Sequence, residues 1–129
     1  MGAFEGMQIA ASGLTAQRFR MDVISANLAN VDTTRTPQGG PFRREMVVFQ
    51  ARQGAVPGVQ VVGIKQDKSP PKRIYDPGSP DADASGYVLM PNINPVMEMT
   101  DMISASRSYE ANITTLDAFK SMANKALEI

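Results

Sequence analysis

Apolar side chains recur at helical spacing through the last 34 residues of the chain, from Val96 to Ile129. This stretch contains no glycine and no proline, and Pro95 just before it favours a helix start. Its apolar stripe advances in steps of three and four residues and includes Met99, Met102, Tyr109, Ile113, Leu116 and Phe119. The pattern predicts a helix roughly 50 Å long, which exceeds the diameter of a compact domain of this size, about 30 Å. Such a helix needs a partner along its apolar side.

The first segment, from Ala3 to Thr34, predicts a second long helix. Its apolar residues alternate at spacings of four and three, as in a coiled-coil seam, and include Met7, Leu14, Met21, Ile24, Leu28 and Val31. Gly13 lies inside this pattern and costs about 1 kcal/mol relative to alanine, which favours a kink or a frayed first half. Two interpretations are open: packing on the core of its own domain, or pairing with the other end of the chain and with neighbouring copies. The length of the seam and its C-terminal counterpart favour the second.

The middle of the chain differs in composition, because all nine prolines lie between Pro37 and Pro95. This shift divides the chain into an N-terminal helix over 1–34, a Pro/Gly-rich middle over 35–95 and a C-terminal helix over 96–129. Four short β-prone runs predict a small sheet or a pair of hairpins, at Glu45–Ala51, Val59–Gln66, Lys72–Tyr75 and Gly86–Met90. The predicted fold class is α+β, with two long terminal helices pairing as a coiled-coil-like bundle and a small β-hairpin region between them.

Charge and hydropathy argue against several classes of partner. The 13 Lys and Arg residues balance 13 Asp and Glu residues, so no net field draws the chain to nucleic acid. No apolar run approaches the roughly 20 residues needed to span a bilayer, which argues against direct membrane insertion. The first residues lack a basic segment followed by an apolar one, so we expect no cleaved secretory signal.

Candidate chemistry is sparse. The chain has no Cys and no His, which excludes disulfides, thiol nucleophiles, imidazole bases and the usual zinc sites. Asp76, Asp81 and Asp83 share one loop but lack the ligand spacing of a calcium-binding EF-hand, so we interpret them as solvated turn residues. The two glycines at Gly39 and Gly40 do not form a phosphate-binding loop pattern. The sequence therefore predicts no catalytic residue, no metal site and no cofactor.

The most specific stretch runs from Ser25 to Arg44. Its asparagines and threonines suit the last turn of a helix, and its prolines and glycines prevent the helix from continuing. Without further information, the stretch is simply a loop with clear helix-stopping residues. It also resembles the signature of the flagellar axial proteins of rod and hook, on the motif Ala-Asn-Leu-Ala-Asn-Val-x-Thr-Thr and its continuation. The residues that carry the resemblance are Asn27, Ala29, Asn30, Thr33, Thr34, Pro37, Gly39, Gly40, Pro41 and Arg43.

Two further features narrow the resemblance. The stretches Pro91–Met99 and Met102–Asn112 match the same family, so the similarity covers both ends of the chain and the order of its parts. Many rod and hook members carry Gly-Tyr after the paired threonines, whereas Arg35-Thr36-Pro37 stands there in this chain. In this respect the chain is similar to the proximal-rod branch of the family rather than to the distal rod or hook.

The resemblance implies a structural subunit of the proximal rod of the bacterial flagellar basal body, the drive shaft that transmits torque for motility. It implies helical assembly with copies of itself and with other rod proteins, through the apolar stripes of both terminal helices. It also implies export by the flagellar type III apparatus without a cleaved signal peptide, and a final location in the periplasmic part of the cell envelope. Because the stripes exceed any core this chain could build alone, we expect the terminal segments to gain order on assembly.

Two other classes of function remain open. In the first, the chain is a stand-alone coiled-coil adaptor or an export-chaperone-like protein, whose ends form a stable dimer that sedimentation would detect. In the second, it is an enzyme such as a rod-associated muramidase, which needs a pair of carboxylates in one pocket. The scattered Asp and Glu residues provide no such pair. The structural interpretation is therefore favoured.

Overall fold

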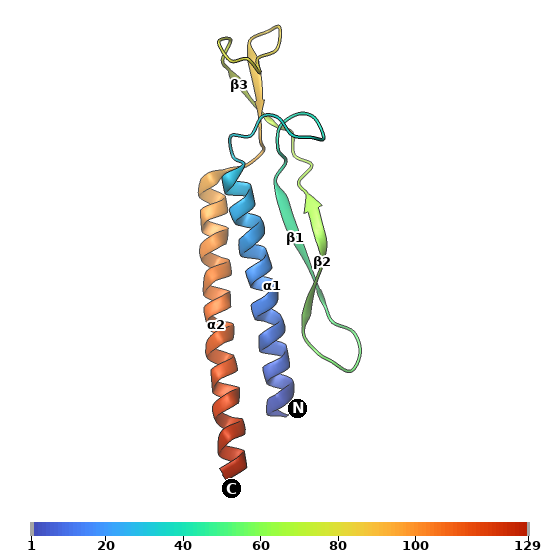
Figure 1. Cartoon of the computed structure of the whole chain (residues 1–129), viewed down its shortest axis with the longest axis vertical. Coiled ribbons are helices and arrows are strands. Elements are labelled where there is room, and N and C mark those ends of the chain that lie inside the picture. The colour runs from blue at the N-terminus through green and yellow to red at the C-terminus, as the bar shows by residue number, and fades with distance from the viewer. Residues whose placement is uncertain (1, 129) are drawn as a thin grey trace.

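The computed structural model describes residues 2–128; Met1 and Ile129, the outermost residues of the two predicted terminal segments, lie outside this range. The two longest elements are helices that lie side by side, joined by a strand-containing middle (Figure 1). The elements in chain order are α1 (Ala3–Ala29), β1 (Glu45–Ala51), β2 (Val59–Gln66), β3 (Lys72–Tyr75), β4 (Tyr87–Met90) and α2 (Pro95–Glu128). The α+β class predicted from the sequence is confirmed.

α1 and α2 run antiparallel and approach each other closely. Gly6 lies against the Phe119 ring and Gly13 lies against the Asn112 side chain. A Cβ atom added at Gly13 would lie 2.7 Å from Asn112 Nδ2, so only glycine permits this approach without displacing the asparagine. α1 is continuous from Ala3 to Ala29, and the kink or fraying expected at Gly13 is not found. The glycine serves helix–helix packing, which offsets its low helix propensity.

α1 ends at Ala29 rather than at Thr34, the end predicted from the sequence. Asn30 leaves the helix with φ −106° and ψ 16°. Its backbone amide and its side-chain Nδ2 both donate to the Ala26 carbonyl, at 3.1 Å and 2.8 Å. A side chain that bonds the last helical turn in this way ends a helix without glycine or proline. Val31 continues the apolar spacing past this end, which is why the pattern overestimated the length of the helix.

The four strands form two antiparallel hairpins. β1 pairs with β2, from Glu45 opposite Gln66 to Ala51 opposite Val59, with an irregularity after Val48. β3 pairs with β4 and projects beyond the ends of the helices (Figure 1). The β1–β2 hairpin packs along α1, so α1 lies between α2 and this hairpin (Figure 1). The strand bounds expected from the sequence agree with the structure, except that β4 begins at Tyr87.

Fully buried side chains concentrate at one end of the helix pair. We call residues 20–29 of α1 with residues 95–108 of α2 the loop end, and residues 3–13 with residues 112–128 the far end. At the loop end, Ala105 is 0% exposed and both Asn27 and Glu98 are 1% exposed. At the far end, the buried residues of α1 are small, and α2 has none among its described residues after Ala105. The helix pair is therefore anchored at one end and shallowly packed at the other.

Candidate assembly surface

The surface between α1 and α2 uses small or polar residues of α1 against larger residues of α2. From α1 it takes Gly6, Ala10, Gly13 and Asn27, of which all but Gly13 are buried. From α2 it takes half-buried side chains that the sequence predicted for the apolar stripe, namely Met102, Tyr109, Leu116 and Phe119. The small residues let the two backbones approach, and the large side chains of α2 cover them. The α2 part of the predicted stripe is thus largely used within the chain.

The predicted apolar seam of α1 does not coincide with the side of α1 that packs against α2. Met7 and Leu14 directly follow Gly6 and Gly13, and one residue turns an α-helix by about 100°. Ser12, which accepts a hydrogen bond from the Val59 amide at 3.0 Å, defines the side of α1 that faces the β1–β2 hairpin. Leu14 follows Ser12 by two residues and so lies on nearly the opposite side of the helix. Met7, Leu14 and Met21 are half-buried, on the side of α1 away from the hairpin.

α2 presents exposed apolar side chains on the same side of the molecule. Asp101 approaches Arg44, at the start of β1, and therefore marks the hairpin side of α2. Met99 and Ile103 are each two residues from Asp101 and thus lie on nearly the opposite side. Their exposed fractions are 54% and 55%, and Ile113, two heptads after Met99, is 38% exposed. We call the combined surface of Met7, Leu14, Met21, Met99, Ile103 and Ile113 the two-helix face.

The remaining predicted interface residues of α1 lie closer to the chain's own core. Ile24 is 5% exposed and lines a small cleft with residues of β1 and α2. Leu28 is half-buried in the last turn of the helix, and Val31 is half-buried in the turn that follows it. These three side chains support the loop end of the pair.

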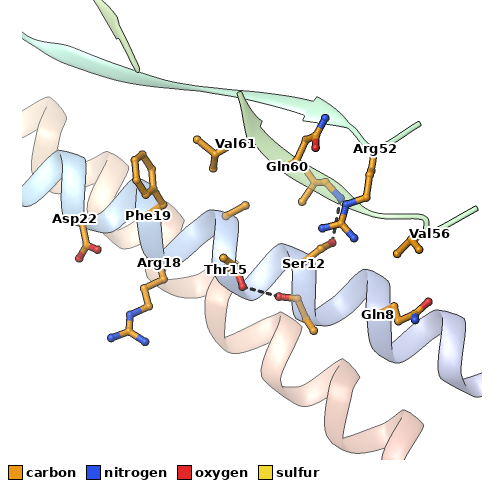
Figure 2. Close-up of a pocket in the computed structure, with 13 residues that line it drawn as sticks. Gln8, Ser12, Thr15, Arg18, Phe19, Asp22, Arg52, Val56, Gln60 and Val61 are labelled. Carbon is orange, nitrogen blue, oxygen red and sulfur yellow. Dashed lines mark hydrogen bonds between the residues drawn. The ribbon is translucent and has the colours of Figure 1, made fainter. Parts of the chain in front are cut away.

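A groove runs between α1 and the β1–β2 hairpin and encloses about 670 Å³ (Figure 2). Phe19 extends from the helix and Val61 from β2 on its two sides, and Arg52 reaches from the hairpin toward α1 (Figure 2). Arg18 and Asp22 line its helix side. The apolar lining comes mainly from Ala11, Ala16, Phe19, Val56, Val59 and Val61.

A buried polar cluster joins α1, β1 and α2 at the loop end. The Asn27 side chain pairs with the backbone of Glu45 in both directions: Nδ2 donates to the Glu45 carbonyl at 2.9 Å, and Oδ1 accepts from the Glu45 amide at 3.0 Å. Nδ2 also donates to Glu98 Oε2 at 3.2 Å, and Glu98 Oε1 accepts from Arg44 Nε. A side chain of α1 thus satisfies the backbone amide and carbonyl of the first residue of β1. A buried polar group is tolerated when all its partners are present, as they are here.

Arg44 also forms ion pairs with two carboxylates outside this cluster. Its guanidinium lies 3.4 Å from Asp67 and 3.5 Å from Asp101, in addition to Glu98. Burial lowers the Arg44 pKa, but the hydrogen bond to Glu98 and the three negative charges raise it above its ordinary value. The Asn92 side chain accepts a hydrogen bond from the Arg44 amide at 2.9 Å. This bond connects the segment between β4 and α2 to the same cluster.

The loop after α1 is closed by its own motif residues. Thr33 Oγ1 donates to Asn30 Oδ1 at 3.1 Å, and its carbonyl accepts from the Phe42 amide at 3.0 Å. Gly39 and Gly40 have φ values of 87° and 73°, in the left-handed region that favours glycine. Of the other motif positions, Ala29, Pro37 and Arg43 are exposed and Pro41 is half-buried. The motif therefore encodes a helix end and a tight loop that returns the chain to β1.

Asp81 has a structural partner that the sequence did not indicate. It accepts a hydrogen bond from Thr34 Oγ1 at 2.6 Å and forms an ion pair with Arg35. The Thr34 hydroxyl and the Arg35 guanidinium lower the pKa of the Asp81 carboxyl below its usual value. The interpretation of Asp81 as a merely solvated turn residue was wrong, because it attaches the β3–β4 hairpin to the motif loop.

Comparison with known proteins agrees with this arrangement. The family model described as "Flagella basal body rod protein" matches residues 7–35. A second family model, described as "Flagellar basal body rod FlgEFG protein C-terminal", matches residues 84–129. The chain is 49% identical to the flagellar basal-body rod protein FlgC of Borreliella burgdorferi, covering 100% of this chain and 98% of the relative. It is 47% identical to FlgC of Bacillus subtilis, covering 100% and 99%. The chain belongs to the FlgC family of flagellar basal-body rod proteins.

The two matched segments meet in this member of the FlgC family at the buried cluster. Asn27 lies in the N-terminal matched segment and Glu98 in the C-terminal one, and the two side chains are hydrogen-bonded. Sequence reasoning singled out Asn27, missed Glu98, Arg44 and Gly6, and interpreted Gly13 as a kink or fraying point. A search for apolar periodicity cannot find these residues, because none of them is a large apolar residue. The two glycines carry a positional signal, since Gly6, Gly13 and Asn27 are separated by 7 and 14 residues.

Among residues 2–128, no group of His, Cys, Asp or Glu is arranged to hold a metal ion. Neither helix, over its described residues, is long and apolar enough to cross a membrane.

Proposed function

We propose that this chain is a subunit of the proximal rod and assembles helically with its own copies and with other rod proteins through the two-helix face. Its FlgC-family membership identifies it as a structural component of the flagellar basal body and not as an enzyme. The observation that carries the finer proposal is the exposure of the apolar side chains Met99, Ile103 and Ile113 on α2, of which Ile113 lies level with Leu14 because Gly13 contacts Asn112. Contiguous apolar surface of this kind is typical of a protein–protein contact.

The geometry of the helix pair supports a load-bearing role in the drive shaft. The hairpin covers one side of α1 and α2 covers another, which leaves the two-helix face as the side on which further helices can pack. Packing apolar stripes of neighbouring subunits at crystal-like density produces a stiff assembly, because such interiors deform little. Transmission of torque from motor to hook follows from that stiffness.

The proposal includes export through the flagellar type III apparatus without a cleaved signal peptide, and assembly in the periplasmic region of the envelope. A shallowly packed far end supports this route, because a helix pair with few buried side chains opens at a modest free-energy cost. A stand-alone coiled-coil adaptor or chaperone is not favoured, since relatives along the full chain are rod proteins.

The test is a charge placed on the two-helix face. Ile113→Asp leaves the free chain folded, because this side chain is already 38% exposed. In an assembled contact the buried carboxylate costs several kcal/mol, so incorporation into purified basal bodies falls by more than about tenfold and swimming stops. The matched control is Thr115→Asp, an exposed position two residues further along α2 and therefore on nearly the opposite side of the helix from Ile113. Normal incorporation and swimming of the Ile113→Asp variant would rule out this face as the contact.

A further inference from the structure

The groove between α1 and the β1–β2 hairpin has the character of a binding surface for a helix. Its floor is apolar and shallow, with Ala11 and Ala16 leaving room above α1. Val56 on its hairpin side is 45% exposed and Phe19 on its helix side is 37% exposed, so apolar area is open to a partner. Along α1 the lining extends from Gln8 to Asp22, which is roughly 21 Å of helix.

The groove and the two-helix face lie on different sides of α1. Ser12 and Phe19 line the groove, whereas Leu14, two residues after Ser12, points to nearly the opposite side. A subunit with a projecting apolar surface on one side and a receptive groove on another makes heterologous contacts with its copies. Contacts of this type generate an open helical array and not a closed dimer.

The exposed side of α2 has the length and charge that the groove requires. Ile103 and Ile113 are separated by roughly 15 Å along the helix, which fits within the groove. Glu110 and Asp117 follow Ile103 at seven-residue steps and therefore lie on the same side of α2. The groove supplies the opposite charge through Arg52 on its hairpin side and Arg18 at its helix-side rim, where one carboxylate, Asp22, also lies (Figure 2).

We infer that the groove receives the exposed side of α2 from a neighbouring copy of this chain. Ile103 and Ile113 of that copy enter the apolar groove, and its Glu110 and Asp117 face Arg18 and Arg52. This inference rests on the proposed assembly function, and it adds the surface to which the two-helix face binds.

The absence of native cysteine allows a direct test by disulfide cross-linking. Two singly substituted chains, Thr15→Cys in the groove and Ile113→Cys on α2, are co-expressed in a flagellated host that lacks its own copy of the subunit. Because each chain carries one thiol, a heterodimer forms only if the groove of one copy meets α2 of another within disulfide distance. We expect oxidised basal bodies to yield this heterodimer, identified by mass spectrometry of the linked peptides.

The matched control replaces Ile113→Cys with Thr115→Cys, which is exposed on nearly the opposite side of α2 and should give no heterodimer with Thr15→Cys. Equal yields from both pairs, or no yield from either when both chains are present in the basal body, overturn the groove assignment but leave the rod function intact. A disulfide from Thr15→Cys to a different rod protein assigns the groove to that protein and likewise overturns the inference. Absence of the chain from basal bodies overturns the proposed function itself.

A charge exchange provides a second readout. Arg18→Glu with Arg52→Glu should reduce incorporation about tenfold, because like charges then meet across the contact. Adding Glu110→Arg with Asp117→Arg in the same chain should restore it, which a simple folding defect would not allow. Unchanged incorporation of the chain with both arginines replaced, or failure of the reversed acids to rescue it, contradicts the predicted contact.

Discussion

The two ends of the helix pair are built by different means. At the loop end, Asn27 and Glu98 are almost completely buried and bonded to each other, and Arg44 links them to two further carboxylates. At the far end, α2 buries no side chain among its described residues, and Met122 and Leu127 are 51% and 83% exposed. The loop end is therefore specified by directional polar contacts within the chain. The far end retains exposed apolar surface, which neighbouring subunits would cover in the proposed assembly.

This difference shows how a helix pair can have a fixed register at one end and still keep apolar surface exposed at the other. Polar contacts fix the register of two helices, since a shift by one residue would leave Asn27 and Glu98 buried without partners. Apolar contacts are less directional and supply most of the free energy of association. The loop end therefore sets which residues of the two helices face each other, and we expect the far end to be stabilised by contacts in the assembled rod.

The largest effect should come from removing the buried charge at the loop end. Glu98→Ala removes the buried carboxylate from Arg44 and one of the two acceptors of the Asn27 amide, in a site of 1% exposure, which should cost roughly 3–5 kcal/mol of unfolding free energy. Urea denaturation followed by circular dichroism measures the loss. Glu110→Ala, an exposed carboxylate on the same helix, is the control and should change stability by less than about 0.5 kcal/mol. Similar values for the two variants would show that the loop end is not the anchor.

A smaller difference should separate the two ends in the free, unmodified chain. Backbone amides near Val23 and Ala105 should exchange with deuterium about 100-fold more slowly than those from Leu116 to Ala126, equivalent to roughly 2.7 kcal/mol. The physical reason is that local opening of the far end exposes few buried side chains. Hydrogen exchange with mass spectrometry on the dilute chain gives both rates. Uniform protection along α2 would contradict the expected order on assembly.

The smallest effect should be a loss of stability in acid. The Thr34 hydroxyl and Arg35 lower the Asp81 pKa, and hydrogen bonds from Ser69 together with Arg44 lower the Asp67 pKa. A carboxylate with a lowered folded-state pKa stabilises the fold at pH values above its ordinary pKa of 3.8, and this contribution disappears as the pH falls through the folded value. The melting temperature should therefore drop below about pH 4 and vary less with pH in Asp81→Asn. The matched control is Asp117→Asn; an unchanged pH profile for Asp81→Asn would contradict the role given to Asp81.

Much of the fold could be predicted from the sequence because local signals and tertiary structure agree. Turn residues bound β1, β2 and β3 at the predicted positions, and Pro95 marks the start of α2. The end of α1 was missed because Asn30 ends the helix through its hydrogen bonds, a property that it shares with many residues inside loops. The proline-free sequence to Thr34 gave no other stop signal.

The assignment of surfaces was harder, because hydrophobic periodicity counts apolar residues and ignores small ones. The periodicity identified Met7, Leu14 and Met21 on α1, whereas α2 packs on the neighbouring residues Gly6 and Gly13. The Glu98–Arg44 contact joins residues 54 positions apart, and no local pattern encodes such a pair. The α1 seam stays a prediction of an interface, because the sequence alone could not say which partner covers each of its apolar residues.

The β1–β2 hairpin is fastened to α1 at both of its ends. Near the turn, the Val59 amide donates to Ser12, and at the open end Asn27 exchanges two hydrogen bonds with Glu45. The two fastening points on α1 are 15 residues apart, or roughly 22 Å. Hydrogen bonds at only one point would allow the hairpin to rotate about that point, whereas bonds at two points this far apart hold it parallel to the helix. A lateral force on the hairpin is therefore transmitted to α1 over this whole length, so that the hairpin and the helix move together as one rigid unit.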